Sequence, residues 1–368
     1  MSGRRIWAAA STVSIMMGLV LAGPGGAWAQ CSKDAKAGQK AASQHDAGRH
    51  PQLVWIDTDI GDDIDDAFAL GLALDEPDFR ILGISTAFGD TELRASLVDR
   101  FLGAAGHGWH NTGPIPVTAG VHTETDNVMT QAAYARESPE RTHPDGVAEL
   151  LAQIRLHPGK ITMIAIGPLF NVGAMIDRDP KTFRKLRRVV MMGGSIHRGY
   201  DGQNGEQRPP DAEWNINRDP KDAEKLLESG VPIYMMPLDS TQIHLDAAGR
   251  EAIFGGKTEA GSAVTAQIEE LYKEWMANTA SHSPTPTLFD PVAVAYAIEP
   301  AMCPMQPMRL RVDEKGFTLP IEGKPNVQVC MKSDERVFLS FLTRRLTGEA
   351  GETCEVDSSG TGVELGAK

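Results

Sequence analysis

Residues Trp55–Leu70 read WIDTDIGDDIDDAFAL, a stretch with six aspartates among the ten positions from Asp57 to Asp66. An apolar run comes before the aspartates and another follows them, so the stretch predicts a buried strand, an acidic loop and a helix. Carboxylates packed this densely repel one another, and a bound cation would offset that repulsion. Calcium and magnesium take oxygen ligands, whereas zinc favours histidine and thiolate. The stretch therefore predicts a calcium site, with magnesium second because it needs a tighter octahedron.

The composition predicts a large folded domain and argues against a nucleic-acid partner. The chain has 368 residues, and its 41% hydrophobic content is enough for a substantial core. The formal net charge is -13, and removing Arg4 and Arg5 with an N-terminal leader would make it -15. Such an acidic chain would repel the phosphate backbone, so we expect no nucleic-acid partner.

The first 29 residues have the pattern of a secretory signal peptide. A charged start is followed by a mostly apolar segment, and Ala27-Trp28-Ala29 offers a small-x-small cleavage site. The apolar segment is too interrupted for a stable membrane span. We therefore expect export to the periplasm or the medium, with no membrane attachment after cleavage. The expected organisation is a signal peptide (1–29), a flexible lead (30–51), a folded domain (52–347) and a loose tail (348–368).

Four cysteines in an oxidising compartment predict one or two disulfides. They are Cys31, Cys303, Cys330 and Cys354. Cys303 and Cys330 flank an expected hairpin and are the favoured pair, although the other pairings stay open. The spacings do not fit a zinc site.

Apolar strands alternate with amphipathic helices along most of the chain. This alternation predicts a mainly parallel, doubly wound α/β sheet with helices on both faces. The expected strands are 53–59, 80–89, 160–167, 187–194 and 231–239. The expected helices are 67–74, 93–106, 146–156, 220–230, 262–281, 290–298 and 335–346. Residues 308–319 and 326–332 look like antiparallel strands.

In such a fold the loops after the parallel strands meet at one edge of the sheet, where ligands bind. Several polar motifs fall in these loops. They are the aspartate cluster, Gly89-Asp90, residues 166–171 with Asn171, residues 191–200, residues 211–220, and Asp290 at a helix start. Their convergence would surround a metal ion with oxygens. One or two of the aspartates could instead only cap a helix.

EF-hands and haloacid dehalogenase phosphatases also carry closely spaced aspartates. An EF-hand needs glycine at loop position 6 and glutamate at position 12, where Asp62 and Phe68 stand, so it is excluded. A phosphatase of the second kind would use Asp57 as nucleophile and Asp59 as acid, but it expects threonine or valine where Gly61 stands. This phosphatase stays as an alternative enzyme.

The acidic stretch resembles the Asp-x-Asp-x-Gly-x-Asp-Asp signature of the inosine/uridine-preferring nucleoside hydrolases. Four further motifs are similar to that family and follow its order between Leu53 and Leu346. They are ITMIAIGPLFN (161–171), VVMMGGS (189–195), AEWNINRDPKDA (212–223) and FDPVAVAYA (289–297). The resemblance implies one nucleoside hydrolase-like α/β domain that cleaves ribonucleosides to ribose and free base, as in purine or pyrimidine salvage.

The resemblance also implies a role for each matching residue. The implied calcium ligands are Asp59, Asp66, Asp290 and the backbone carbonyl of Ile166. The implied sugar contacts are Asp65, Asp90, Met192, Glu213 and Asn215. Asp59 would additionally act as general base on a metal-bound water. Carboxylates near the sugar would stabilise the oxocarbenium character of the transition state.

Two departures from the family pattern leave alternatives open. Two extra residues lie between Gly61 and Asp65, so Asp62 and Asp63 compete with the following pair for the Asp-Asp role, and Asp63 could still be a ligand. Phe289 stands where the family often has a histidine that assists the departing base, and phenylalanine cannot donate a proton.

The missing proton donor allows three interpretations. His244, His282 or Tyr200 could assist the base, or the preferred leaving group could depart with little help. In the third, the protein binds a ribosyl ligand without cleaving it, so a non-catalytic binding protein of the same fold is the alternative to a hydrolase. The base preference stays open, and so does the oligomeric state, although hydrolases of this family are commonly dimers or tetramers.

Overall fold

The structure is a computed structural model that describes residues 51–106, 114–202, 205–255, 262–280 and 283–348. The expected signal peptide (1–29), nearly all of the expected lead (30–51) and residues 349–368 of the expected tail lie outside the described residues. In the described part of the chain, every helix is too short or too polar to cross a membrane.

The central feature is an eight-stranded sheet with the order β3-β2-β1-β4-β5-β6-β10-β7. Neighbouring strands run parallel, except that β7 pairs antiparallel with β10. The strands of this sheet are β1 (Gln52–Thr58), β2 (Phe79–Thr86), β3 (Val117–Ala119), β4 (Ile161–Ala165), β5 (Arg188–Met192), β6 (Ile233–Met236), β7 (Met305–Met308) and β10 (Val327–Cys330). A separate hairpin holds β8 (Leu310–Val312) and β9 (Thr318–Pro320).

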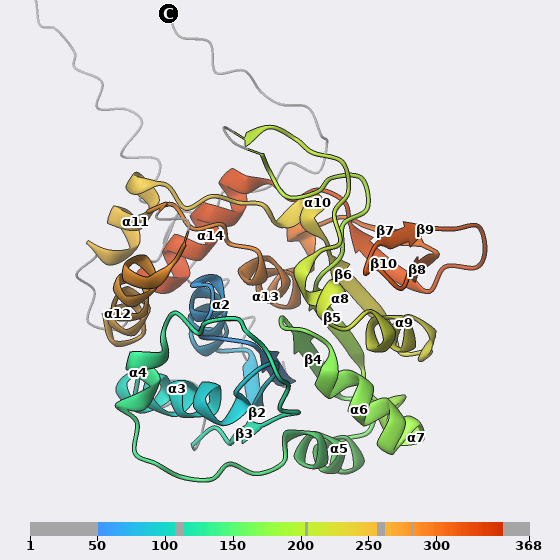
Figure 1. The fold of residues 1–368 in the computed structure, drawn as a ribbon, viewed down its shortest axis with the longest axis horizontal. Coiled ribbons are helices and arrows are strands. Elements are labelled where there is room, and N and C mark those ends of the chain that lie inside the picture. Colours follow the sequence, from blue (N-terminus) through green and yellow to red (C-terminus); the bar gives the residue numbers. More distant parts are fainter. Residues whose placement is uncertain (1–50, 107–113, 203–204, 256–261, 281–282, 349–368) are drawn as a thin grey trace, which may run out of the picture. The chain divides into compact units, whose positions relative to one another are not determined.

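Helices connect the parallel strands and cover both faces of the sheet (Figure 1). In the first half of the described chain they are α2 (Asp65–Leu74), α3 (Thr91–Ala104), α4 (Ala132–Arg136), α5 (Gly146–Leu156), α6 (Phe170–Arg178) and α7 (Pro180–Phe183). In the second half they are α8 (Trp214–Arg218), α9 (Pro220–Glu228), α10 (Leu238–Thr241), α11 (Ala247–Phe254), α12 (Ser262–Asn278), α13 (Asp290–Ile298), the 3-10 helix η2 (Pro300–Met302) and α14 (Glu335–Thr347). The predicted doubly wound α/β fold is confirmed.

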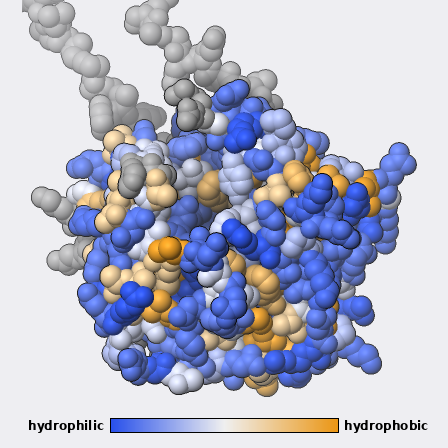
Figure 2. All heavy atoms as spheres, in the orientation of Figure 1, coloured by the Kyte–Doolittle hydropathy of each residue, from blue (hydrophilic) through white to orange (hydrophobic). Residues whose placement is uncertain are grey.

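Two apolar layers, one on each face of the sheet, explain why the central strands read as continuous apolar runs. In β1, Val54 and Ile56 belong to one buried cluster with α2, α13 and α14, and Trp55 belongs to the other with α5, α6 and α9. Successive side chains of a strand point to opposite faces, so both faces need apolar residues when both are covered. On the molecular face shown in Figure 2, hydrophilic side chains predominate and hydrophobic ones form small separate patches.

The C-terminal strands differ from the prediction. Residues 308–319 do not form one strand, because the chain reverses between β8 and β9. The Asp313 carboxylate accepts hydrogen bonds from the backbone N–H groups of Lys315 and Phe317, and Gly316 adopts a positive φ of 82° that suits glycine. The other predicted strand, β10, pairs with β6 and β7 instead. Helix α12 also ends at Asn278 rather than at residue 281.

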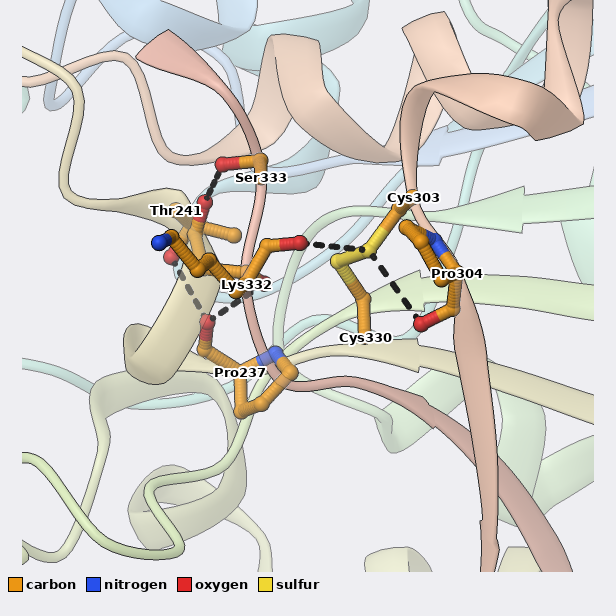
Figure 3. The surroundings of a disulfide bond; sticks show 8 residues. Pro237, Thr241, Cys303, Pro304, Cys330, Lys332 and Ser333 are labelled. Atoms are coloured by element: carbon orange, nitrogen blue, oxygen red, sulfur yellow. Dashed lines mark hydrogen bonds between the residues drawn. A yellow bond between two sulfur atoms is a disulfide. The ribbon is translucent and has the colours of Figure 1, made fainter. Parts of the chain in front are cut away.

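The predicted disulfide between Cys303 and Cys330 is confirmed (Figure 3). It joins the residues just before β7 to the end of β10, with a Cα–Cα distance of 5.7 Å. The bond therefore fixes the antiparallel edge strand β7 to the parallel part of the sheet.

The strand order explains where a site can form. The central strand β1 lies between β2 and β4, and β4 pairs with β5. Asp59 comes directly after β1, Ile166 directly after β4, and Met192 is the last residue of β5. Because these strands are parallel neighbours, the three positions meet at the same edge of the sheet.

Candidate active site

A cavity of about 700 Å³ opens at this carboxyl edge of the sheet. Among the described residues, its lining holds eight carboxylates and four aromatic rings, but no histidine, lysine or arginine. The carboxylates are Asp59, Asp62, Asp63, Asp65, Asp66, Asp126, Glu213 and Asp290. The other lining residues include Asn127, Val128, Thr130, Ile166, Met192, Tyr200, Trp214, Asn215, Trp275, Asn278 and Phe289.

Three of these carboxylates form a compact buried cluster. Asp65 and Asp66 begin α2 and Asp290 begins α13, and one carboxylate oxygen from each lies within 4.8 Å of the other two. The backbone N–H of Asp290 donates to Asp65 Oδ2 at 3.2 Å, and the Thr58 hydroxyl donates to Asp66 Oδ1 at 2.5 Å. The structure therefore brings together the N-termini of two helices that are far apart in sequence.

The chemistry of this cluster fits a hard metal cation. Burial raises the pKa of Asp65, Asp66 and Asp290 well above the ordinary value, and the neighbouring carboxylates raise it further. Charged carboxylates so close together are unfavourable without a compensating positive charge. Oxygen ligands 2.3–2.6 Å from a calcium ion are at most about 5 Å apart, which matches the 4.8 Å limit of this cluster. The cluster could thus hold a metal ion.

Asp59 lies beside this cluster and is only 7% exposed. Its charge contributes to the raised pKa of both Asp66 and Asp290, which places the three carboxylates in one electrostatic group. Burial raises the pKa of Asp59 itself to about 7, although Arg94 opposes the shift. A Cβ at Gly167 would lie 2.9 Å from Asp59 Oδ1, so glycine is needed there for the loop after β4 to approach this carboxylate.

Asp62 and Asp63, the two extra residues of the acidic loop, have other partners. The Asp62 carboxylate accepts hydrogen bonds from Arg94 Nη2 at 2.8 Å and from the Asn127 amide. Asp63 Oδ1 accepts from the backbone N–H of Ile64, and its carbonyl accepts from Gln131 Nε2 at 2.8 Å. The helix start, rather than this insertion, therefore supplies the carboxylates that meet Asp290.

Glu213 and Asn215 form a polar wall of the cavity at the start of α8. Glu213 accepts hydrogen bonds from its own helix, at Asn215 N (2.9 Å) and Ile216 N (3.1 Å), and from Gly194 N at 2.8 Å. Gly194 has a positive φ of 88°, which lets the turn after β5 present this N–H. Burial raises the pKa of Glu213, and these three N–H groups oppose the shift.

Asn215 connects this wall to two strand ends. Its Nδ2 donates to the carbonyl oxygens of Ile166 at 3.2 Å and Met192 at 3.3 Å. Five predicted sugar or metal contacts are thus positioned by one short helix and the ends of three strands, β1, β4 and β5. They are Glu213, Asn215, Ile166, Met192 and the neighbouring Asp59.

Asp57 is fully buried beneath the cavity and does not line it. Its Oδ1 accepts hydrogen bonds from Asn171 Nδ2 at 2.7 Å and from the Ser85 hydroxyl, and burial raises its pKa to about 6. A phosphatase nucleophile must reach its substrate, so the alternative that used Asp57 in this role is wrong. Asp57 instead ties β1 to β2 and α6.

Other candidate residues lie elsewhere. Asp90 is exposed and caps α3 by accepting from Leu93 N at 3.0 Å, and the structure does not bring it to the cavity. His244 is exposed and also lies outside the lining, whereas His282 lies outside the described residues. Of the three groups considered as helpers for a leaving base, the structure places Tyr200 in the cavity.

The sequence reasoning missed several residues of the site. Arg94 was assigned only to a helix, and Trp275 and Asn278 only to another. Both helices are amphipathic, and nothing in their local pattern distinguishes a residue that faces the cavity from one that faces the core. The burial of Arg94, which would have marked it as a residue with specific partners, becomes visible only in the structure.

Comparison with known proteins gives a consistent result. Residues 54–340 match the family model for inosine-uridine preferring nucleoside hydrolases. The chain is 28% identical over 324 residues to the pyrimidine-specific ribonucleoside hydrolase RihA of Citrobacter koseri. This alignment covers 80% of this chain and 97% of that protein. RihA of Salmonella enteritidis is 28% identical over 320 residues, with the same coverage of 80% and 97%.

Solved structures share the fold. The plant nucleoside hydrolase PpNRh1 matches with a TM-score of 0.66 and 24% identity, covering 81% of this chain and 100% of that one. A purine-preferring ribonucleoside hydrolase from Gardnerella vaginalis matches with a TM-score of 0.66 and 22% identity, covering 81% and 98%.

Proposed function

Because the chain belongs to the inosine-uridine preferring nucleoside hydrolase family, we propose that it hydrolyses the N-glycosidic bond of ribonucleosides to ribose and free base. The observation that carries the proposal is the cluster of Asp65, Asp66 and Asp290, whose oxygens lie within 4.8 Å of one another beside Asp59. Such a cluster in a cavity with further sugar-binding groups suits a metal-assisted hydrolysis.

We propose Ca²⁺ as the metal, with Mg²⁺ second, because all the available donors are oxygens in a buried, irregular arrangement. The cation would be held by Asp59, Asp66, Asp290 and the Ile166 carbonyl. A carboxylate oxygen of Asp65 lies within 4.8 Å of the oxygens of Asp66 and Asp290. When bound, the cation supplies Lewis-acid polarisation of the sugar hydroxyls and of water.

Asp59 is the group that would accept a proton from the attacking water. Its carboxylate faces the cavity, and its backbone is fixed because Arg94 donates to its carbonyl oxygen. The main chain that carries this carboxylate is thus held in place before substrate binds. General bases typically contribute about 10²- to 10⁴-fold to rate.

Glu213 and Asn215 would hold the ribose. Glu213 is 1% exposed, and three backbone N–H groups hold its carboxylate in one position at the cavity wall. Positive charge develops on the sugar during cleavage, and a fixed carboxylate nearby stabilises it. Asp65, which also lines the cavity, would contact the ribose hydroxyls.

We also propose that the protein is exported. Support comes from the signal-like sequence at residues 1–29 and from the Cys303–Cys330 disulfide, since such bonds persist mainly in oxidising compartments. A homo-oligomer is a further proposal that rests on the family alone.

A nucleoside panel tests the function. Uridine, cytidine, inosine and adenosine are each incubated with the full chain, and reducing sugar is measured with calcium and with chelator. We expect sugar release that chelator abolishes, and a fall in kcat of about 10²- to 10⁴-fold in Asp59→Asn with ligand affinity retained at saturating calcium. Asp246→Asn, at an exposed helix cap away from the cavity, is the matched control. Tight binding of ribosides without any turnover would instead support the non-catalytic binding protein.

A further inference from the structure

We propose that the preferred substrates are N-ribosides whose base is a cation, joined to the sugar through a quaternary ring nitrogen, as in a pyridinium riboside. This inference rests on the proposed function and adds the chemical class of its substrate. It follows from two properties of the described lining of the cavity, the absence of a proton donor of the histidine, lysine or arginine type and an excess of carboxylates.

The first property concerns the leaving group. When a neutral nucleoside is cleaved, the bond electrons pass to the base nitrogen, which becomes an anion and needs a proton. Among the described lining residues, the one side chain with an acidic proton besides the carboxylates is Tyr200. Its hydroxyl oxygen accepts from Trp214 N at 2.9 Å, and burial raises the pKa of this phenol, which makes it a weaker acid.

Phe289 occupies the position next to this phenol and cannot supply a proton. Its ring meets the Tyr200 ring edge to face, with centroids 6.0 Å apart, and it directly precedes Asp290. The part of the wall that Phe289 and Tyr200 form beside the carboxylate cluster is therefore aromatic, and Phe289 offers no proton there.

A cationic riboside removes this need. The C1′–N bond breaks, and its electron pair neutralises the ring nitrogen, so the base leaves as a neutral molecule. The water oxygen bonds to C1′, and one water proton passes to Asp59 and then to solvent. The balance is riboside cation plus water giving ribose, neutral base and one proton, with no other reactant.

The second property is the charge of the cavity. Eight carboxylates line it, and no described lysine, arginine or histidine shares the lining. Arg94 offsets Asp62 from behind the wall, and a divalent ion would offset two further charges, so carboxylates remain in excess. Asp126 extends this negative charge to the exposed rim.

The aromatic rings suit the same ligand. Phe289, Tyr200 and Trp275 line the cavity, and the faces of aromatic rings attract cations. A flat cationic heterocycle can thus stack on the wall that offers no proton, while the negative rim raises its local concentration.

The test compares a pyridinium riboside, nicotinamide riboside, with uridine, using the full chain in calcium. We expect kcat/KM to be higher for the cation by about tenfold or more. The Phe289→His variant places an acid in the wall, so the ratio of the two kcat/KM values should shrink about tenfold. An unchanged ratio would overturn the proposal. So would a selective loss of uridine cleavage, about a hundredfold, in Tyr200→Phe, because that would identify a working proton donor.

A binding measurement removes the difference in intrinsic reactivity between the two ribosides. N1-methylnicotinamide, a cation, and nicotinamide, its neutral counterpart, are compared as inhibitors of uridine cleavage. We expect the Ki of the cation to be lower by about tenfold, and that difference to shrink in Asp126→Asn and at high salt. Equal Ki values would overturn the proposal while uridine cleavage still supports the hydrolase. If no riboside is cleaved at all, the proposed function itself fails.

Discussion

The guanidinium of Arg94 lies 2.8 Å from Asp62 Oδ2, and its side chain is only 3% exposed. The same group donates to the carbonyl oxygens of Asp59, of Ile60 at 3.0 Å and of Phe88 at 2.8 Å. One buried arginine on α3 therefore holds the acidic loop in shape from behind. Asp62 lies in the two-residue insertion by which this loop differs from the family signature. Its carboxylate is the group through which Arg94 anchors the loop.

Arg94→Ala should destabilise the protein and disorder the site. It leaves the Asp62 carboxylate without its cationic partner, and breaking a buried pair in this way typically costs about 3–5 kcal/mol. We expect the free energy of unfolding in urea to fall by roughly that amount, together with nucleoside cleavage. Arg178→Ala is the matched control, because Arg178 and Asp145 form a half-exposed pair, for which about 0–1 kcal/mol is typical. Equal effects in the two variants would contradict the anchoring role.

Asp66→Asn should separate cation binding from folding. The variant removes one of three mutually repelling buried carboxylates, so we expect the melting temperature in chelator to stay the same or rise. The increase in melting temperature on adding calcium should shrink or disappear, because a hard cation binds neutral amide oxygen less well than carboxylate. Differential scanning calorimetry with and without calcium measures both. A full calcium response in Asp66→Asn would show that the ion binds elsewhere, and Asp246→Asn controls for a change of one surface charge.

The stability of the cation-free protein should depend on pH through Asp57. Burial raises the pKa of this carboxyl from 3.8 to about 6, so the folded state binds the proton more tightly than the unfolded state. Its contribution is thus fully present below about pH 4 and is lost as the pH rises through about 6. We expect melting temperatures in chelator to fall over this interval, and to fall less in Asp57→Asn. Parallel curves for wild type and variant would contradict the raised pKa.

The parts of the fold that the sequence predicted are those where local pattern and tertiary structure agree. Strand β4 and helix α5 were expected within a residue or two of their bounds, because a continuous apolar run and a regular helical stripe leave few alternatives. The short strands β3 and β7 were not expected. Each has only three or four residues, and each forms because a neighbouring strand supplies hydrogen-bond partners from elsewhere in the chain.

The sequence predicts those site residues that lie in a recognisable motif after a strand or at the start of a helix. Asp65, Asp66 and Asp290 converge because each lies at the start of a helix at the carboxyl edge of the sheet, whereas the implied ligand set had Asp59 in place of Asp65. Asp90 follows β2 at the same edge, yet its carboxylate caps α3 and stays outside the cavity. Which way a loop turns depends on backbone angles such as the positive φ of 63° at Phe88, and the sequence gives no sign of that angle for a phenylalanine.

The Cys303–Cys330 disulfide should stabilise the fold without affecting the chemistry. It closes a loop with a sequence separation of 27, for which chain-entropy estimates give about 3–4 kcal/mol. Neither cysteine lines the cavity, and the bond joins β7 to β10 at the far edge of the sheet from β1. We expect the Cys303→Ser/Cys330→Ser double variant to lose stability of this order in urea unfolding, while its kcat/KM for a nucleoside at 25 °C stays near wild type. Reductant should lower the melting temperature of the wild type and leave the variant unaffected. A large loss of kcat/KM in the folded double variant would show instead that this edge of the sheet is coupled to the carboxylate cluster.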